Sequence, residues 1–122
     1  HNPMQLELSL GEAVSRGGKK IEVPLKVSIP LASLEWMPGE TQPLARLELV
    51  VGTRDSRGEV AVPQPVLREL RVPVAELAPN ALQRFALVVP LVVEAAPAVV
   101  AVGVRDLGSG LSSYARLLTP VP

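Results

Sequence analysis

The chain contains no cysteine, which excludes a disulfide framework and a zinc site held by thiolates. Its only histidine is His1, at the start of the chain, so a histidine-rich metal site and a nucleophile activated by an imidazole base are excluded as well. Aromatic residues are scarce, with one Trp, one Phe and one Tyr in 122 positions. Sugar stacking and single-stranded nucleic-acid binding use exposed aromatic faces, so few residues are available for them. We therefore predict no catalytic residue and no cofactor, and expect the protein not to be an enzyme.

Neither sign of charge dominates the chain. Twelve basic and twelve acidic residues give a formal net charge of zero at pH 7. A protein that binds nucleic acid or an anionic membrane needs a concentrated positive field, and no run of like charges supplies one. The stretch GGKKIE lacks the first glycine of a phosphate-binding loop, and GSG follows no strand-to-helix pattern. The expected partners are therefore other domains of the same chain or other proteins, and not nucleic acid.

One long apolar run, residues 85–104, has the length of a membrane-spanning helix. Glu94 stands at its centre, two prolines interrupt it and valine dominates it, so we predict two strands joined by a turn at 94–97 and no membrane insertion. The opening HNPMQLELSL is no signal peptide, because no basic start precedes an apolar run. The missing initiator methionine suggests an excised piece of a longer protein, and residues 1–4 are expected to be disordered or added for expression.

Apolar side chains recur at every second position, which is the pattern of half-buried strands. From Ile21 to Leu31 every odd residue is apolar, whereas the even positions carry lysine, glutamate, serine or proline. The same alternation runs through 6–10, 47–51 and 70–74. The run at 85–93 is apolar on more than one face, as in a central or doubly covered strand.

Turn residues and prolines complete the prediction of the fold. Clusters rich in glycine, proline, serine and aspartate separate the apolar runs. Pro24, Pro30, Pro73 and Pro90 lie in or beside strands, where a missing amide hydrogen points to edge strands or bulges. One short helical turn is expected near 75–82. We predict a single all-β domain over the whole chain, an antiparallel immunoglobulin-like β-sandwich of about seven strands.

The sequence Val-Gly-x-Arg-Asp occurs twice, at 51–55 and at 102–106. Each copy is predicted to end a strand that enters a hairpin turn, with the aspartate accepting backbone amides and a later glycine taking a positive φ angle. The alternation places apolar residues on one face and the arginine on the other. The inward residues are Val51 and Thr53 in the first copy and Val102 and Val104 in the second.

Five residues form a candidate binding site at one end of the sheets: Trp36, Arg54, Asp55, Arg105 and Asp106. The two Arg-Asp pairs could supply charges to one ligand, and calcium held by the two aspartates is a remote alternative. The plainer interpretation assigns the aspartates to solvated turns and leaves the arginines in solvent. Trp36, beside a Pro-Gly turn, is then packed in the core or at its rim.

The stretches VSIPLASLEWMPGETQPLARLELVVGTRDSRGEVAVPQPVLRELRVPV and FALVVPLVVEAAPAVVAVGVRDLGSGLSSYARL resemble the carboxy-terminal β-sandwich region of bacterial von Willebrand factor type A-related proteins. The shared features are a Val-Pro-Leu strand, an Arg-Asp-x-x-Gly hairpin and a late Val-Gly-Val-Arg-Asp strand before a Ser-rich turn. The resemblance covers about residues 21–118. The chain departs from the family in having EAAPA where a Pro-Gly turn is common, and it lacks the type A domain with its Asp-x-Ser-x-Ser metal motif.

The resemblance implies an extracytoplasmic module, periplasmic or secreted, attached to an adhesion-type domain of a larger chain. The first hypothesis is therefore a non-catalytic structural or interaction module that supports or docks a neighbouring domain. A ligand-binding or carbohydrate-binding module, with its site around Trp36, Asp55 and Asp106, is the alternative. An enzyme ranks third, because the sequence offers no cluster of titratable groups for it.

Overall fold

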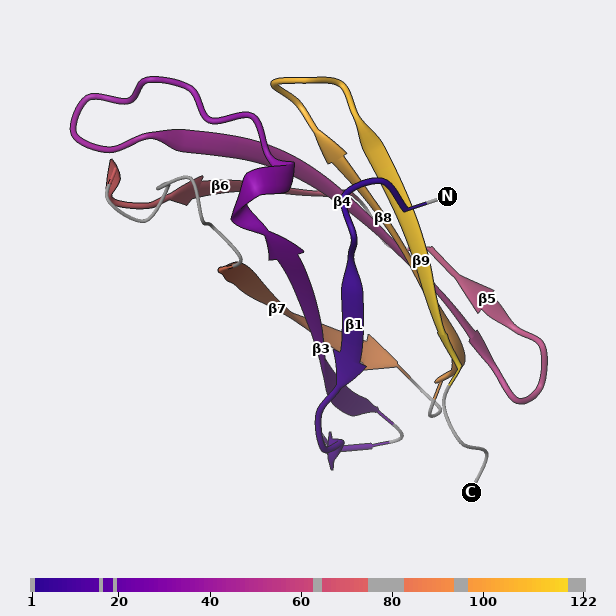
Figure 1. The fold of residues 1–122 in the computed structure, drawn as a ribbon. Helices are drawn as coiled ribbons and strands as arrows, with labels where there is room; N and C mark the ends of the chain where they lie inside the picture. The colour runs from indigo at the N-terminus through magenta and orange to yellow at the C-terminus, as the bar shows by residue number, and fades with distance from the viewer. Residues whose placement is uncertain are drawn as a thin grey trace.

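The computed structural model describes residues 2–15, 17–18, 20–62, 65–74, 83–93 and 97–118, and these form two antiparallel sheets packed face to face (Figure 1). No α-helix occurs in these ranges, and η1 (Leu31–Ser33) is a 3-10 turn. The predicted all-β sandwich is therefore confirmed. The first sheet contains β1 (Glu7–Leu10), β2 (Val14–Ser15), β3 (Ile21–Pro30) and β7 (Arg84–Val93), and the second contains β4 (Leu44–Asp55), β5 (Val60–Ala61), β6 (Val66–Arg71), β8 (Pro97–Asp106) and β9 (Ser112–Leu118).

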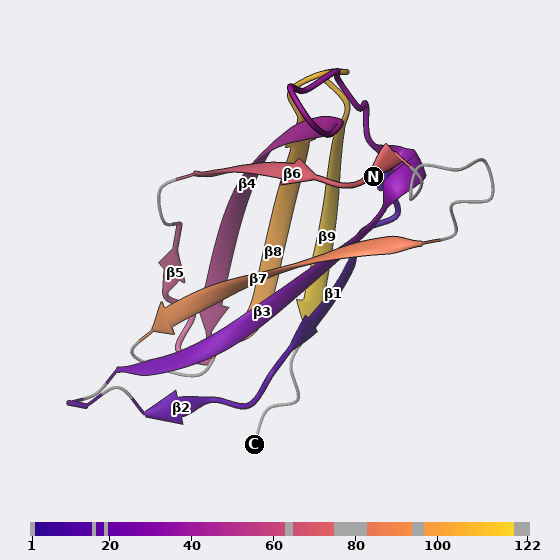
Figure 2. The same cartoon turned by 90° about the vertical axis from the view of Figure 1, so that its left-hand side faces the viewer.

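The strand order is that of an immunoglobulin-like sandwich. In the first sheet β3 lies between β7 and the successive short strands β1 and β2. In the second sheet β4 lies between β8 and the successive strands β6 and β5, and β9 follows β8. Figure 2 shows β3 and β7 running obliquely across the strands of the other layer. The described ranges contain nine strands, two of them with two residues each, against about seven predicted.

The core lies between the sheets and is formed by the alternating residues of both. Val23, Leu25, Val27 and Ile29 of β3 are buried, as the period of two predicts. Burial of each such side chain contributes roughly 1.5–3 kcal/mol to folding. From the same sheet, β7 adds Leu87, Val89 and Leu91. The facing sheet supplies the opposing residues, which are Leu47, Leu49, Val51, Val100, Val102 and Val104.

The long apolar run at 85–104 forms two strands, as predicted, but these strands do not pair with each other. β7 pairs with β3 in the first sheet, whereas β8 pairs with β4 and β9 in the second. The connection therefore crosses from one sheet to the other, so the two strands are not neighbours in one sheet. Residues 94–96 of the expected turn, and the expected helical turn at 75–82, lie outside the described residues. None of the described helical residues forms an element long and apolar enough to cross a bilayer.

Two prolines, Pro24 of β3 and Pro90 of β7, lie directly opposite each other. Pro90 belongs to an edge strand, as expected, because β7 pairs with no described strand besides β3. The expectation is wrong for Pro24, since β3 is central. The Pro24 carbonyl accepts a hydrogen bond from the Gly11 amide at 2.8 Å, so its backbone groups face the gap where β1 has ended and β2 has not begun. A central strand accommodates proline there because no ladder hydrogen bond is lost.

Of the four residues expected to be disordered, His1 lies outside the described residues, whereas Met4 is packed against the rest of the domain. The Met4 side chain is fully buried in the core, and its amide donates a hydrogen bond to the buried Ser113 Oγ at 2.7 Å. Asn2 closes the segment, because its side chain bonds both the amide and the carbonyl of Leu6. The anchoring partner lies 109 residues away, and no local pattern indicates a contact of that kind.

Candidate functional site

The two Val-Gly-x-Arg-Asp copies lie side by side on β4 and β8, with Val51 directly opposite Val102. Because the strands are antiparallel, the copies run away from this pair in opposite directions. Asp106 lies opposite Leu47, eight residues along β4 from Asp55, which corresponds to about 26 Å. The predicted single site containing both aspartates is therefore not formed, and neither is the paired calcium site.

Asp55 organises the turn between β4 and β5. Its Oδ1 accepts hydrogen bonds from the amides of Arg57 and Glu59 at 2.8 and 3.1 Å, and the Arg57 guanidinium bonds its Oδ2 at 3.0 Å. The Gly58 amide returns to the Asp55 carbonyl, and Gly58 takes a φ of 85°, which glycine adopts without strain. The predicted hairpin turn, with its aspartate cap and fourth-position glycine, is confirmed.

The pKa of Asp55 reflects two opposing effects. Desolvation in the turn raises the pKa. The hydrogen bonds from the Arg57 side chain and from the amides of Glu59 and Arg57, together with the Arg57 charge, lower the pKa, and their combined effect is larger than that of desolvation. The net result is a pKa below the ordinary value. The ionised form of Asp55 is therefore the one that stabilises the turn.

Asp55→Asn is expected to lower the free energy of unfolding at pH 7. The difference in this free energy between the variant and the parent protein is expected to become smaller in acid. A carboxylate with a depressed pKa in the folded state stabilises above its unfolded pKa of about 4 and loses that contribution as pH falls through the lower folded value. Urea unfolding at pH 7, 5, 4 and 3 measures the effect. A difference between the two proteins that stays constant over this range would show that the charge of Asp55 plays no part.

Asp106 is fully buried, although the sequence suggested a solvated carboxylate. It continues the inward series of Val102 and Val104, so the alternation itself directs it into the sandwich. Its Oδ2 accepts the Glu35 amide at 2.7 Å and its Oδ1 accepts the Gly108 amide at 3.0 Å. The Asp106 side chain thus joins the β8–β9 turn to the loop before β4, and Figure 2 shows both at the same end of the sandwich.

Trp36 lies at this same end and packs at the rim of the core, in agreement with the plainer interpretation. Its Nε1 donates a hydrogen bond to the Leu31 carbonyl at 2.9 Å, so the polar atom of the indole is already satisfied. The structure therefore brings Trp36 and Asp106 together through the loop that contains Glu35. Both serve to attach that loop, and the half-buried indole offers no open face comparable to a sugar-stacking platform.

Arg54 and Arg105 point outward, as predicted, on the face of the second sheet that is turned away from the core. Both are exposed, and each sits one residue before its aspartate. The five candidate residues are thus divided among three places. Asp55 lies in the β4–β5 turn, Trp36 and Asp106 lie at the opposite end, and the arginines lie on the outer sheet face.

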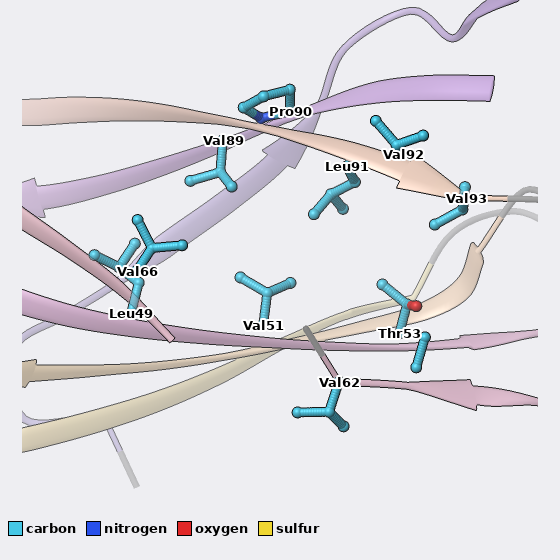
Figure 3. A pocket seen from close by; sticks show the side chains of 11 residues that line it. Leu49, Val51, Thr53, Val62, Val66, Val89, Pro90, Leu91, Val92 and Val93 are labelled. Atoms are coloured by element: carbon cyan, nitrogen blue, oxygen red, sulfur yellow. The ribbon is translucent and has the colours of Figure 1, made fainter. Parts of the chain in front are cut away.

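An apolar cleft of about 440 Å³, which the sequence did not indicate, opens along one side of the sandwich (Figure 3). Val89 and Leu91 point from β7 towards Leu49 and Val51 of β4, while Pro90 and Val92 point away. The cleft opens on the side of β4 that faces away from β8. On this side β4 has no described partner strand between its pairing with β6 and its pairing with β5. Its remaining lining residues are Thr53, Ala61, Val62, Val66 and Val93.

The lining of the cleft defines what it can do. Among the lining residues that the structure describes, Thr53 has the one polar side chain and none is titratable. Around it, large apolar side chains are exposed, with Val62 at 64%, Val88 at 61% and Val92 at 54%. The available signal in the sequence was the run Val60, Ala61 and Val62 after the turn, because three successive apolar residues break the alternation of apolar and polar positions. A cleft with this described lining and an apolar rim is suited to apolar groups.

Across the described ranges, no group of three or more histidine, aspartate or glutamate side chains is placed to hold a metal ion. A comparison with models of known protein families gives no match, and a comparison with curated proteins gives none either.

Proposed function

We propose that this domain is a non-catalytic interaction module that supports or docks a neighbouring protein domain, and that the apolar cleft receives an apolar segment of that neighbour. The observation that supports this proposal is the composition of the cleft and its rim. An enclosed pocket suits a small ligand, whereas here the exposed valines extend the apolar surface beyond the cleft on both β5 and β7. Contiguous exposed apolar surface of this kind is characteristic of protein–protein contacts.

The free edge of β7 adds backbone groups to the same surface. Because the backbone of Pro90 faces away from β3, the amides and carbonyls of the neighbouring even residues, Ala86, Val88 and Val92, face the free edge too. Pro90 itself supplies no donor, which limits indiscriminate strand addition. A docked segment therefore finds apolar side chains in the cleft and a few hydrogen-bonding groups beside it.

The parent context remains part of the proposal. The resemblance to bacterial von Willebrand factor type A-related proteins, together with a sandwich fold of the implied kind, supports a place in an extracytoplasmic chain beside an adhesion-type domain. A ligand-binding module is the second candidate, and the volume of the cleft supports it, because about 440 Å³ is within the range of small-molecule sites. A carbohydrate is the weaker form of that candidate, since the described lining of the cleft offers one hydroxyl and otherwise apolar side chains.

The test uses the domains that flank this one in its complete reading frame. Each is produced separately and titrated into the isotopically labelled domain, with amide shifts followed by NMR. Saturable shifts around Val62, Val66 and Val92 are expected, and Val62→Asp should reduce the affinity by about tenfold or more because it places a charge in the apolar contact. Leu118→Asp, a matched change at an exposed leucine of β9, should leave the affinity unchanged.

Two results would contradict the docking proposal. One is the absence of saturable shifts with every flanking domain. The other is a saturable change in Trp36 fluorescence on titration with glycans or calcium, since a docking module offers them no site and a ligand-binding module does.

A further inference from the structure

Charge is segregated on the outer face of β4, β8 and β9. The outward residues of these strands include four arginines, Arg46, Arg54, Arg105 and Arg116, against one acidic residue, Glu48. The chain as a whole is formally neutral, so this face carries an excess of positive charge that the composition conceals. None of Arg54, Arg105 and Arg116 forms an ion pair with a residue that the structure describes.

The arginines border two open depressions on this face. Arg54 and Arg116 line a depression of about 220 Å³, and Arg105 lines another of about 620 Å³ together with Tyr114. Gly52 and Gly103, the glycines of the two sequence copies, form part of the floor. A side chain at Gly103 would place its Cβ 3.0 Å from the Tyr114 ring, so the glycine is what lets the ring lie against the sheet.

The repeated Val-Gly-x-Arg-Asp sequence determines the layout of this outer face. Its antiparallel copies place a bare backbone position near the centre of the face and an arginine towards each end. Arg105 lies opposite Glu48, six residues along β4 from Arg54, so the two arginines stand about 20 Å apart along the strands. An extended segment of about six residues spans that distance.

We infer that the outer face of β4, β8 and β9 is a second interaction surface, and that it binds an acidic extended segment of a partner protein. Charge complementarity identifies the partner as acidic, because this face has three arginines without ion pairs within the described chain and one acidic residue, Glu48. The residue types fit protein recognition, since arginine and tyrosine are enriched at protein interfaces and arginine pairs with carboxylates in bidentate geometry. Tyr114, 60% exposed, offers an apolar ring between the charges.

Nucleic acid fits this surface less well than protein does. Single-stranded nucleic acid is bound by successive aromatic platforms along a basic groove, and this face has one aromatic ring and a glutamate in the middle of its arginines. The inference shares with the proposed function only the premise that the domain binds proteins. It involves none of the residues that line the apolar cleft except Thr53, whose side chain points inward.

The experiment titrates the labelled domain with an eight-residue peptide of alternating Glu and Thr at low salt and follows amide shifts by NMR. Saturable shifts are expected at Gly52, Gly103 and Tyr114, with affinity that falls as salt is added. The Arg54→Glu/Arg116→Glu double variant should bind about tenfold more weakly or worse. Arg68→Glu, at an exposed arginine of β6, is the matched control and should change the affinity less than twofold.

Three outcomes overturn the inference: no saturable shifts with the acidic peptide, the same affinity for the double variant, or tighter binding of an eight-nucleotide oligodeoxythymidylate than of the peptide. An alternating Lys and Thr peptide should not bind. Val92→Asp, at an exposed cleft residue of β7 in the other sheet, should leave the acidic peptide titration unchanged, so failure of this surface and failure of the cleft are separate results.

Discussion

Val102→Asp is expected to destabilise the protein strongly at 25 °C. Val102 is 1% exposed, lies opposite Val51 in the middle of the β4–β8 pair and belongs to the core cluster. A carboxylate there is buried without a partner, and the penalty exceeds about 4 kcal/mol, a large part of the roughly 5–15 kcal/mol that stabilises a domain of this size. Urea unfolding followed by circular dichroism measures the loss.

Two control variants separate the causes. Val102→Thr keeps the shape but buries a hydroxyl group, so a cost of about 1–3 kcal/mol is expected. Arg105→Ala removes an exposed side chain on the opposite face of the same strand and should change the free energy of unfolding by less than about 0.5 kcal/mol. If Arg105→Ala proved more damaging than Val102→Asp, the assignment of inner and outer faces would be wrong.

The assignment of faces is what the sequence predicts best, because side-chain alternation is a local property of a strand. The inward positions of Val51, Thr53, Val102 and Val104 follow from the period of two and are confirmed. The turn at Asp55 is predictable for the same reason, since its donors, acceptors and glycine all lie within five residues.

Pairing between distant strands is harder to predict, because alternation determines a face and not a neighbour. The run at 85–104 is equally compatible with a hairpin and with a crossing between sheets, and the structure has the crossing. The separation of Asp55 from Asp106 also follows from pairing. Two copies of a motif on neighbouring antiparallel strands end at opposite ends of the sheet. Nothing within either copy indicates that the two strands are neighbours.

The candidate site fails at the residue where two sequence rules conflict. Asp106 occupies an inward phase of its strand and also the first position of a turn, and the turn rule suggested solvent exposure. The inward phase prevails, because the Glu35 amide, 71 residues away, supplies a hydrogen-bond donor that only the tertiary structure reveals. The apolar cleft was missed for a related reason, since it depends on where β5 and β6 leave β4 uncovered.

Asp106→Ala is therefore expected to destabilise the protein far more than Asp55→Ala, although both aspartates end the same sequence motif. Each carboxylate accepts two backbone amides. The Asp106 carboxylate is fully buried, and removing it leaves the part-buried amides of Glu35 and Gly108 without their acceptor, at about 1–3 kcal/mol each, so a loss of roughly 2–6 kcal/mol is expected. The amides around Asp55 are at the surface and can turn to water, so a much smaller loss is expected there.

Hydrogen exchange distinguishes this account from a general loss of packing. If the Asp106 carboxylate holds the loop before β4, its removal should accelerate exchange of the Glu35 amide and increase the exposure of Trp36, while the amides of β3 keep their protection relative to global unfolding. Asp106→Asn, which keeps the shape and one acceptor oxygen, should fall between the parent protein and Asp106→Ala in both stability and Glu35 exchange. Equal costs for Asp106→Ala and Asp55→Ala would mean that burial of the accepted amides does not set the difference between the two turns.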